Sequence, residues 1–251
     1  MFRQLVLTAA FVFAYGAAGW AADLNVYGPG GPLPAMKEAA EAFGRQKGID
    51  LAVTAGPTPS WIERARTDAD IIFSGSESMM TDFVSTMNGQ IRSENVEPLY
   101  LRRAAILVRP GNPKKIQGLG DLAKPGMKVL VVHGAGQTGL WEDVAGRTGD
   151  IASVRNLRAN IGTFAANSAV ARKTWTEDAG YDAWLIWNIW QVSNPALADI
   201  VEIDDAHRIW RDAGVVLTER ARQKPAAAAF VAFLKSGEGA AIFRKWGWTT
   251  P

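Results

Sequence analysis

The sequence predicts an α/β protein of two lobes that are joined by crossing strands. Three consecutive units of strand, small-residue turn and helix fill residues 24–87, and repeated units of this kind build a parallel sheet. The apolar run PLYLRRAAILV, residues 98–108, is long enough to leave one lobe and enter another. A second series of strand, turn and helix begins at residue 128, which indicates a second sheet.

The first lobe is expected to hold three short strands, each followed by a helix. The strands are predicted at residues 24–27, 49–53 and 70–73. The first helix has apolar residues at helical spacing from Leu33 to Phe43, and Gly48 is a typical C-terminal stop. A short helix is expected after the second strand and a longer one, over residues 79–87, after the third.

The second lobe is expected to begin with a strand over residues 128–132 and to contain a helix over 167–175. The aromatic run 181–190 is predicted to be the strand that returns the chain to the first lobe. Residues from about 204 onward, including AAAAFVAFLKSGEGAAIFRKWGW, are predicted to form helices packed on the first lobe. The first lobe then comprises residues 23–103 and 192–251, and the second lobe comprises residues 104–191.

The first 22 residues have the organisation of a secretory signal peptide. Arg3 precedes an apolar core from Leu5 to Phe13, and small residues follow up to the expected cleavage site after Ala21 or Ala22. The alternative is an N-terminal membrane anchor, but the apolar run is too short to span a bilayer. No cysteine follows the core to accept a lipid. We therefore expect an exported protein.

The composition excludes several classes of function. The chain has no cysteine, which excludes disulfides, thiol nucleophiles and cysteine-ligated zinc. Its two histidines lie far apart without ligand spacing, so neither a metal nor another cofactor is expected. Without Arg3 the formal net charge of +2 falls to about +1, which gives no electrostatic basis for binding nucleic acid or an anionic membrane.

Four turns carry the residues from which a ligand site can be built. GPGGP, GPTPS, SGSES and GAGQTG each stand where a predicted strand passes into a helix. In parallel α/β sheets such turns share one edge, and the unpaired N–H groups of helix starts bind anions there. Glycine allows close approach of the backbone, and serine and threonine add hydroxyl donors. Ser60-x-x-Glu63 and Ser74-x-x-Glu77 also fit the capping box, which needs no ligand.

Two catalytic interpretations of these turns are weaker. GAGQTG matches G-x-G-x-x-G, but no acidic residue follows at the distance that a dinucleotide site requires. An exported serine hydrolase with Ser74 or Ser76 as nucleophile remains the rival hypothesis, although FSGSES is not G-x-S-x-G. Its base would have to be His133, which lies in a separate turn.

Large and charged side chains near the predicted cleft have two interpretations each. Alternation along the crossing strand sends Arg102 and Arg103 to opposite faces, so at most one of them enters the cleft. Arg158 and Arg172 are alternatives. Trp61 and Trp187 are assigned with equal weight to the core and to the wall of a ligand site, whereas we expect Trp184 and Trp190 in the core.

Specific motifs in the chain resemble a known family. The stretches VYGPGGP, TAGPTPSWIERA, DADIIFSGSESMMTDF and YDAWLIWNIWQVSNP are similar to bacterial periplasmic solute-binding proteins of the molybdate and sulfate type, and within them to the accessory colonization factor C subfamily. The similarity covers nearly the whole chain after residue 22. It implies a type II periplasmic binding protein fold, in which a monomer closes over a ligand and delivers it to an ABC-type permease.

The resemblance also implies a set of ligand-binding positions. Those in the first lobe are Gly30, Gly31, Thr58, Ser60, Ser74 and Ser76, and those in the second lobe are Gln137, Thr138, Gly139, Asn167 and Ser168, with Trp187 or Asn188 on the return strand. To these we add Trp61, Gly75 and Arg103 as candidates. The first turn departs from the molybdate type, because glycines stand where those relatives carry a serine.

These positions predict a binding protein without catalytic activity and with an anionic ligand. A sulfate-like tetrahedral oxyanion is the first choice. A small carboxylate or an amino acid, held partly by an arginine, is the alternative. An adhesion module is suggested only by the name of the subfamily.

Overall fold

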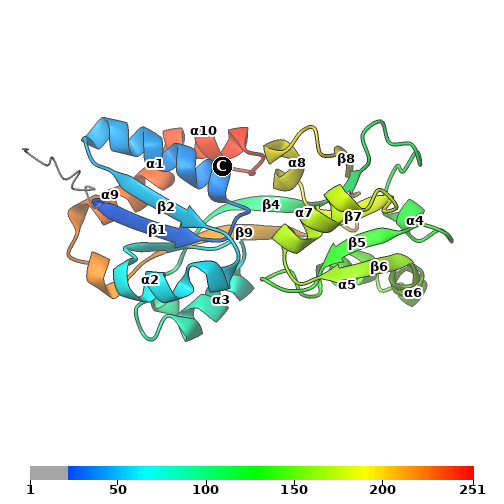
Figure 1. Ribbon diagram of the computed structural model, residues 1–251, viewed down its shortest axis with the longest axis horizontal. Helices are drawn as coiled ribbons and strands as arrows, with labels where there is room; N and C mark the ends of the chain where they lie inside the picture. Colours follow the sequence, from blue (N-terminus) through cyan, green and yellow to red (C-terminus); the bar gives the residue numbers. More distant parts are fainter. Residues whose placement is uncertain (1–21) are drawn as a thin grey trace, which may run out of the picture.

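The computed structural model describes residues 22–251, so the predicted signal peptide lies outside the described residues except for Ala22. Within this range the chain folds into two α/β lobes that lie end to end along the long axis of the molecule (Figure 1). Strands β4 (Glu97–Val108) and β9 (Trp210–Leu217) run between the lobes. The two-lobed α/β prediction is therefore confirmed.

One continuous sheet runs through both lobes, with the strand order β2-β1-β3-β9-β4-β7-β5-β6. In the first lobe, β1 (Leu24–Gly28) is parallel to both β2 (Leu51–Ala55) and β3 (Ile71–Phe73). In the second lobe, β5 (Val129–Val132) is parallel to both β6 (Ile161–Ala165) and β7 (Ala183–Trp187). The two parallel series place their strand-to-helix turns toward the junction of the lobes (Figure 1).

Strand β4 joins the two halves by changing its partners midway. Its first half, up to Arg103, pairs with β9, and its second half, from Ala104, pairs with β7. The second half also pairs with β8 (Asp199–Glu202), although the sequence analysis assigned residues 192–251 to the first lobe. The chain therefore re-enters the first lobe later than expected, through β9.

The prediction that residues 181–190 return the chain to the first lobe is also wrong. Residues 183–187 form β7, which lies between β4 and β5 and is buried at all five positions, as an interior strand of the second lobe. The actual return strand, β9, falls in a region expected to be helical. Its charged residues Arg211 and Asp212 interrupt the apolar pattern because they lie where the strand crosses between the lobes. The sequence analysis also missed α6 (Ile151–Asn160) and β6.

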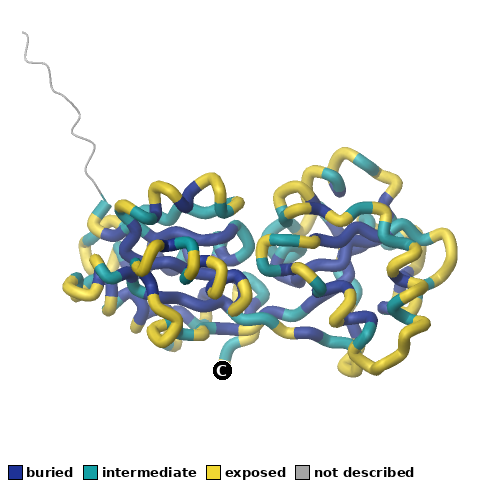
Figure 2. Tube along the Cα trace, turned by 90° about the horizontal axis from the view of Figure 1, so that it is seen from below, coloured by how far each residue is buried: buried dark blue, intermediate teal, exposed yellow. Residues whose placement is uncertain are grey.

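Helices cover both faces of the first-lobe sheet. Helices α1 (Leu33–Lys47), α9 (Pro225–Leu234) and α10 (Gly237–Lys245) lie on one face, and α2 (Ile62–Asp68) and α3 (Glu77–Thr86) lie on the other (Figure 1). Successive strand residues point to opposite faces, so Val26 packs in the core beneath α1 while Tyr27 packs in the core beneath α2 and α3. Figure 2 shows the buried strands between exposed helical surfaces.

The second lobe repeats this plan on a smaller scale. Its helices are α4 (Leu119–Leu122), α5 (Leu140–Gly146), α6, α7 (Ser168–Glu177) and α8 (Ile189–Ser193), and short 3-10 turns elsewhere in the chain occupy Thr58–Ser60, Ser93–Asn95 and Glu219–Ala221. The rings of Trp175 and Trp184 pack 6.2 Å apart in its core. Trp184 therefore lies in the core, as the sequence predicted.

Between residues 22 and 251 no single helix is both long and apolar enough to cross a membrane. The bent pair α9 and α10 passes the same criteria of length and composition only when the two helices are taken together.

Candidate ligand-binding site

A cavity of about 90 Å³ lies where the strand-to-helix turns of the two lobes meet. The first lobe contributes Pro29, Gly30, Gly31, Pro32, Gly56, Pro57, Thr58, Gly75 and Met79. The second lobe contributes Ala135, Gln137, Asn167, Ser168, Ala169 and Trp190, and Arg102 comes from the crossing strand. The cavity has room for several water molecules or for one small solute.

Arg102 is the only charged side chain in this lining. Its exposed fraction is 4%, and no ion pair joins it to a carboxylate among residues 22–251. The guanidinium donates a hydrogen bond to the carbonyl oxygen of Gly75, and its Nε has no hydrogen-bond partner. It lies over the ring of Trp187, 4.6 Å from the centroid, and 5.4 Å from that of Trp248. A buried cation without a counter-ion is costly, so the site favours an anion.

The same burial acts on the ionisation of Arg102. Desolvation lowers the pKa of its guanidinium to about 9, and the nearby charge of Asp212 opposes this shift. At neutral pH the side chain therefore still carries its positive charge.

Two glycines make room for this guanidinium. A Cβ atom on Gly31 would lie 2.9 Å from the Nη1 of Arg102, and a Cβ atom on Gly75 would lie 2.8 Å from its Nη2. Both distances are shorter than a carbon and a nitrogen normally tolerate without a bond. The sequence analysis explained the first turn by close approach of a ligand, but at Gly31 the space is taken by Arg102. At Gly30 a Cβ atom would meet nothing within 4 Å.

Helix starts from both lobes supply further positive potential. The turn at Gly30 leads into α1, the turn at Gly75 leads into α3, and Asn167 begins α7. Ser76 and Asn167 cap α3 and α7, because their side-chain oxygens accept the N–H groups of Met79 and Val170. The positive ends of three helices thus meet at the cavity.

Gln137 and Ser168 join the two second-lobe turns. The Nε2 of Gln137 donates a hydrogen bond of 2.7 Å to the Oγ of Ser168. The Oε1 of the same amide is buried and has no partner. Two residues of the lining, Arg102 and Gln137, thus each have a buried polar atom without a hydrogen-bond partner among the described residues.

The structure brings seven of the sequence-predicted residues into the lining. They are Gly30, Gly31, Thr58, Gly75, Gln137, Asn167 and Ser168. Thr138, Gly139, Trp187 and Asn188 lie outside it, as do Ser60, Trp61, Ser74 and Ser76.

The hydroxyl residues outside the lining make local hydrogen bonds. Ser60 donates to the carbonyl oxygen of Pro57, Ser74 accepts the N–H of Gly214, and Ser76 caps α3. Trp61 packs in the core, and its indole N–H donates to the carbonyl oxygen of Gly56. Neither capping box forms as the pattern predicted, because Trp61 stands at the start of α2 and Ser76, not Ser74, caps α3.

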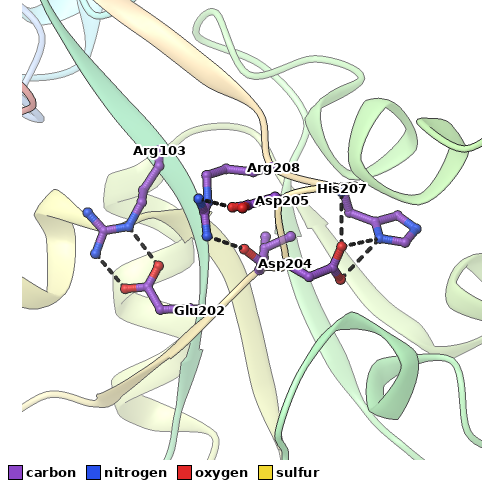
Figure 3. A network of polar contacts seen from close by, with 7 residues as sticks. Arg103, Glu202, Asp204, Asp205, His207 and Arg208 are labelled. Carbon is purple, nitrogen blue, oxygen red and sulfur yellow. Dashed lines mark hydrogen bonds and ion pairs between the residues drawn. The ribbon is translucent and has the colours of Figure 1, made fainter.

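Arg103 is not brought to the cavity. It forms an ion pair with Glu202 of β8, with its Nε 2.7 Å from a carboxylate oxygen (Figure 3). Alternation along β4 explains this placement, because Arg102 shares the buried face with Tyr100. Local composition gave no signal for this choice, because apolar residues precede Arg102 on both faces of the strand. Arg158 and Arg172 also lie outside the lining.

Two other lining residues were missed by the sequence analysis. Trp190 packs against the core, as expected, but it also lines the cavity, where α8 follows β7. Met79 reaches the cavity from the first turn of α3. With the prolines they give the cavity apolar walls, a feature that the turn motifs did not predict.

The residues of the hydrolase hypothesis are not assembled. Ser74 and Ser76 are engaged with the backbone, and His133 is exposed with its ring 5.9 Å from that of Phe164. Beside Ser76, burial and the nearby Asp212 raise the pKa of Glu77.

The Ser76 hydroxyl also donates a hydrogen bond of 3.3 Å to the carbonyl oxygen of Gly136, which links the first lobe to the second across the cleft.

Residues 24–249 match the family of bacterial extracellular solute-binding proteins. The chain belongs to this family. Members of this solute-binding family bind their ligands without catalysis, so the protein is not an enzyme. No curated protein matches the chain with significance.

Two solved structures of PEB3 are similar to this extracellular solute-binding protein over most of its length. Peb3 from Campylobacter jejuni is 38% identical, with a TM-score of 0.85 over 91% of this chain and 100% of its own. PEB3 with L-phospholactate bound gives 39% identity and a TM-score of 0.86 over the same shares.

More distant structures establish the fold. The sulfate-binding protein SubI from Mycobacterium tuberculosis H37Rv is 16% identical, with a TM-score of 0.73 over 90% of this chain and 85% of its own. The molybdate-binding protein of Azotobacter vinelandii is also 16% identical, with a TM-score of 0.69 over 91% of this chain and 100% of its own. The predicted type II periplasmic binding protein fold is confirmed.

Replacing the glycines beside Arg102 is expected to weaken anion binding. In Gly31→Ala and Gly75→Ala the new Cβ atom displaces the guanidinium, and we expect a loss of about tenfold in affinity, roughly one charge-assisted hydrogen bond. Gly237→Ala is the matched control, because its Cβ atom meets nothing within 4 Å. Titration calorimetry with L-phospholactate and sulfate measures the effect. Unchanged affinity in both cavity variants would contradict this role for the glycines.

The affinity for an anion is expected to fall as the pH rises above about 9. A bound anion raises the pKa of Arg102 above its ligand-free value of about 9, so the guanidinium is protonated in both states at lower pH. Above that pH the free protein loses the proton first, and binding must then restore it. Calorimetry with sulfate from about pH 7 to about pH 10.5 tests this, and a constant affinity over the whole range would refute it.

Proposed function

We propose that this protein is a periplasmic receptor that captures a small anion between its lobes. The observation that carries the proposal is Arg102, a buried guanidinium in the wall of the interlobe cavity that forms no ion pair among residues 22–251. The starts of α1, α3 and α7 add positive potential at the same place. An anion would pair with the charge of Arg102 and accept a hydrogen bond from its guanidinium.

We propose a tetrahedral oxyanion, as in the sulfate-like first choice, as the group that Arg102 holds. PEB3, which shares more than a third of its residues with this chain, has been crystallised with L-phospholactate, a molecule with a phosphoryl and a carboxylate group. The apolar walls formed by Met79, Trp190 and the prolines favour a ligand with a small organic part. A small carboxylate is the second candidate, because Arg102 can also bind a carboxylate with two parallel hydrogen bonds.

Closure of the lobes is the proposed mechanism of capture. An anion that contacts the turns of both lobes has a higher affinity for the closed form, and its binding energy therefore favours closure. The contact between Ser76 and Gly136 is available only when the two lobes meet. We propose that the closed monomer, exported by its N-terminal segment, is recognised by an ABC-type permease. The finer assignment to the accessory colonization factor C subfamily is part of the same proposal.

Thermal-shift screening of the chain from residue 23 tests this function. We expect phosphate, sulfate, L-phospholactate or small carboxylates to raise the melting temperature, since a ligand at about 100 times its dissociation constant stabilises by about 2.7 kcal/mol. Tryptophan fluorescence should change at the same concentrations, because Trp190 lies at the cavity. Chloride at equal ionic strength is the control. No stabilisation by any of these anions would refute the proposal.

A further inference from the structure

Gln137 restricts the chemistry of the ligand in a way that Arg102 alone does not. Its side chain is 6% exposed, and its Nε2 is engaged by Ser168 at 2.7 Å. The Oε1 of the amide is left buried without a donor. A buried acceptor without a partner costs free energy, and a ligand that offers an N–H or O–H group removes that cost.

The two unpartnered atoms lie in different parts of the molecule and need different hydrogen-bond partners. Arg102 lies on the crossing strand, and its unpartnered Nε needs an acceptor. Gln137 lies in the turn between β5 and α5, and its unpartnered Oε1 needs a donor. A ligand that satisfies both must carry an anionic oxygen and a hydrogen-bond donor.

We propose that the site selects tetrahedral anions that carry a proton, with the hydroxyl of a hydrogen phosphate group donating to the Oε1 of Gln137 and the phosphoryl oxygens accepting from Arg102. This inference rests on the proposed function. Sulfate has the same shape, but at neutral pH it has no proton to donate and leaves the acceptor unpaired. Sites that bind a hydroxyl through a buried polar group reject analogues that lack it more strongly than apolar pockets reject a missing methylene.

Competition between phosphate and sulfate tests the inference on the unmodified protein. At about pH 8 inorganic phosphate is chiefly the dianion HPO₄²⁻, which equals sulfate in charge and shape and differs from it by one proton. We expect phosphate to bind at least about tenfold more tightly in titration calorimetry. Sulfate that binds as tightly as phosphate would overturn the inference, since the amide would then not present an acceptor.

A substitution of Gln137 tests whether this residue causes the preference for phosphate over sulfate. In Gln137→Leu the acceptor is absent, so we expect the affinity for phosphate to fall to that for sulfate while sulfate binds no more weakly than before. Gln117→Leu, an exposed site in the same lobe, is the matched control and should keep the preference for phosphate. A preference that survives in Gln137→Leu would overturn the assignment to this residue.

The outcomes distinguish this inference from the proposed function. If phosphate and sulfate both stabilise the protein equally, anion capture stands and the requirement for a donor fails. If no anion binds at all, the proposed function fails first, and the inference fails with it.

Discussion

The rest of the site depends on one constraint: the Arg102 guanidinium is buried and forms no ion pair with a carboxylate of residues 22–251. A charge removed from water needs compensation, and among residues 22–251 it comes from the carbonyl oxygen of Gly75, the ring faces of two tryptophans and the more distant Asp212. The absence of side chains at Gly31 and Gly75 gives the guanidinium its position. The folded chain therefore keeps a buried positive charge with which a small anion can pair.

The position of Arg102 links this charge to the movement of the lobes. It precedes by two residues the point at which β4 exchanges β9 for β7 as its partner, so the charge lies on the strand that connects both lobes. Other contacts across the cleft are modest: Arg211 of β9 pairs with Asp143 of α5 at 2.8 Å, but both side chains are partly exposed and such pairs contribute about 0–1 kcal/mol. Ligand contacts are thus expected to dominate the equilibrium of closure.

The sequence predicted the architecture better than the site. Periodicity and turn residues located β1, β2, β3 and the crossing strand, because apolar residues dominate all four and a small-residue turn follows each of the first three. The sequence analysis misplaced the return strand, because Arg211 and Asp212 interrupt the apolar pattern of β9. At the site, the turn motifs found Gly30 and Gln137 but not Arg102. The choice between Arg102 and Arg103 depends on strand register, which pairing with β9 sets and local composition does not.

The most direct test of this account compares the melting temperature of the wild-type protein with that of Arg102→Met, each without anion and with phosphate, sulfate or L-phospholactate. A buried charge without a counter-ion does not stabilise the empty protein, so the variant should melt at the same temperature or higher in the absence of anion. It should also lose the stabilisation that the best anion gives the wild type. A variant that is strongly destabilised without anion, and yet gains as much stability from the anion as the wild type does, would contradict the account.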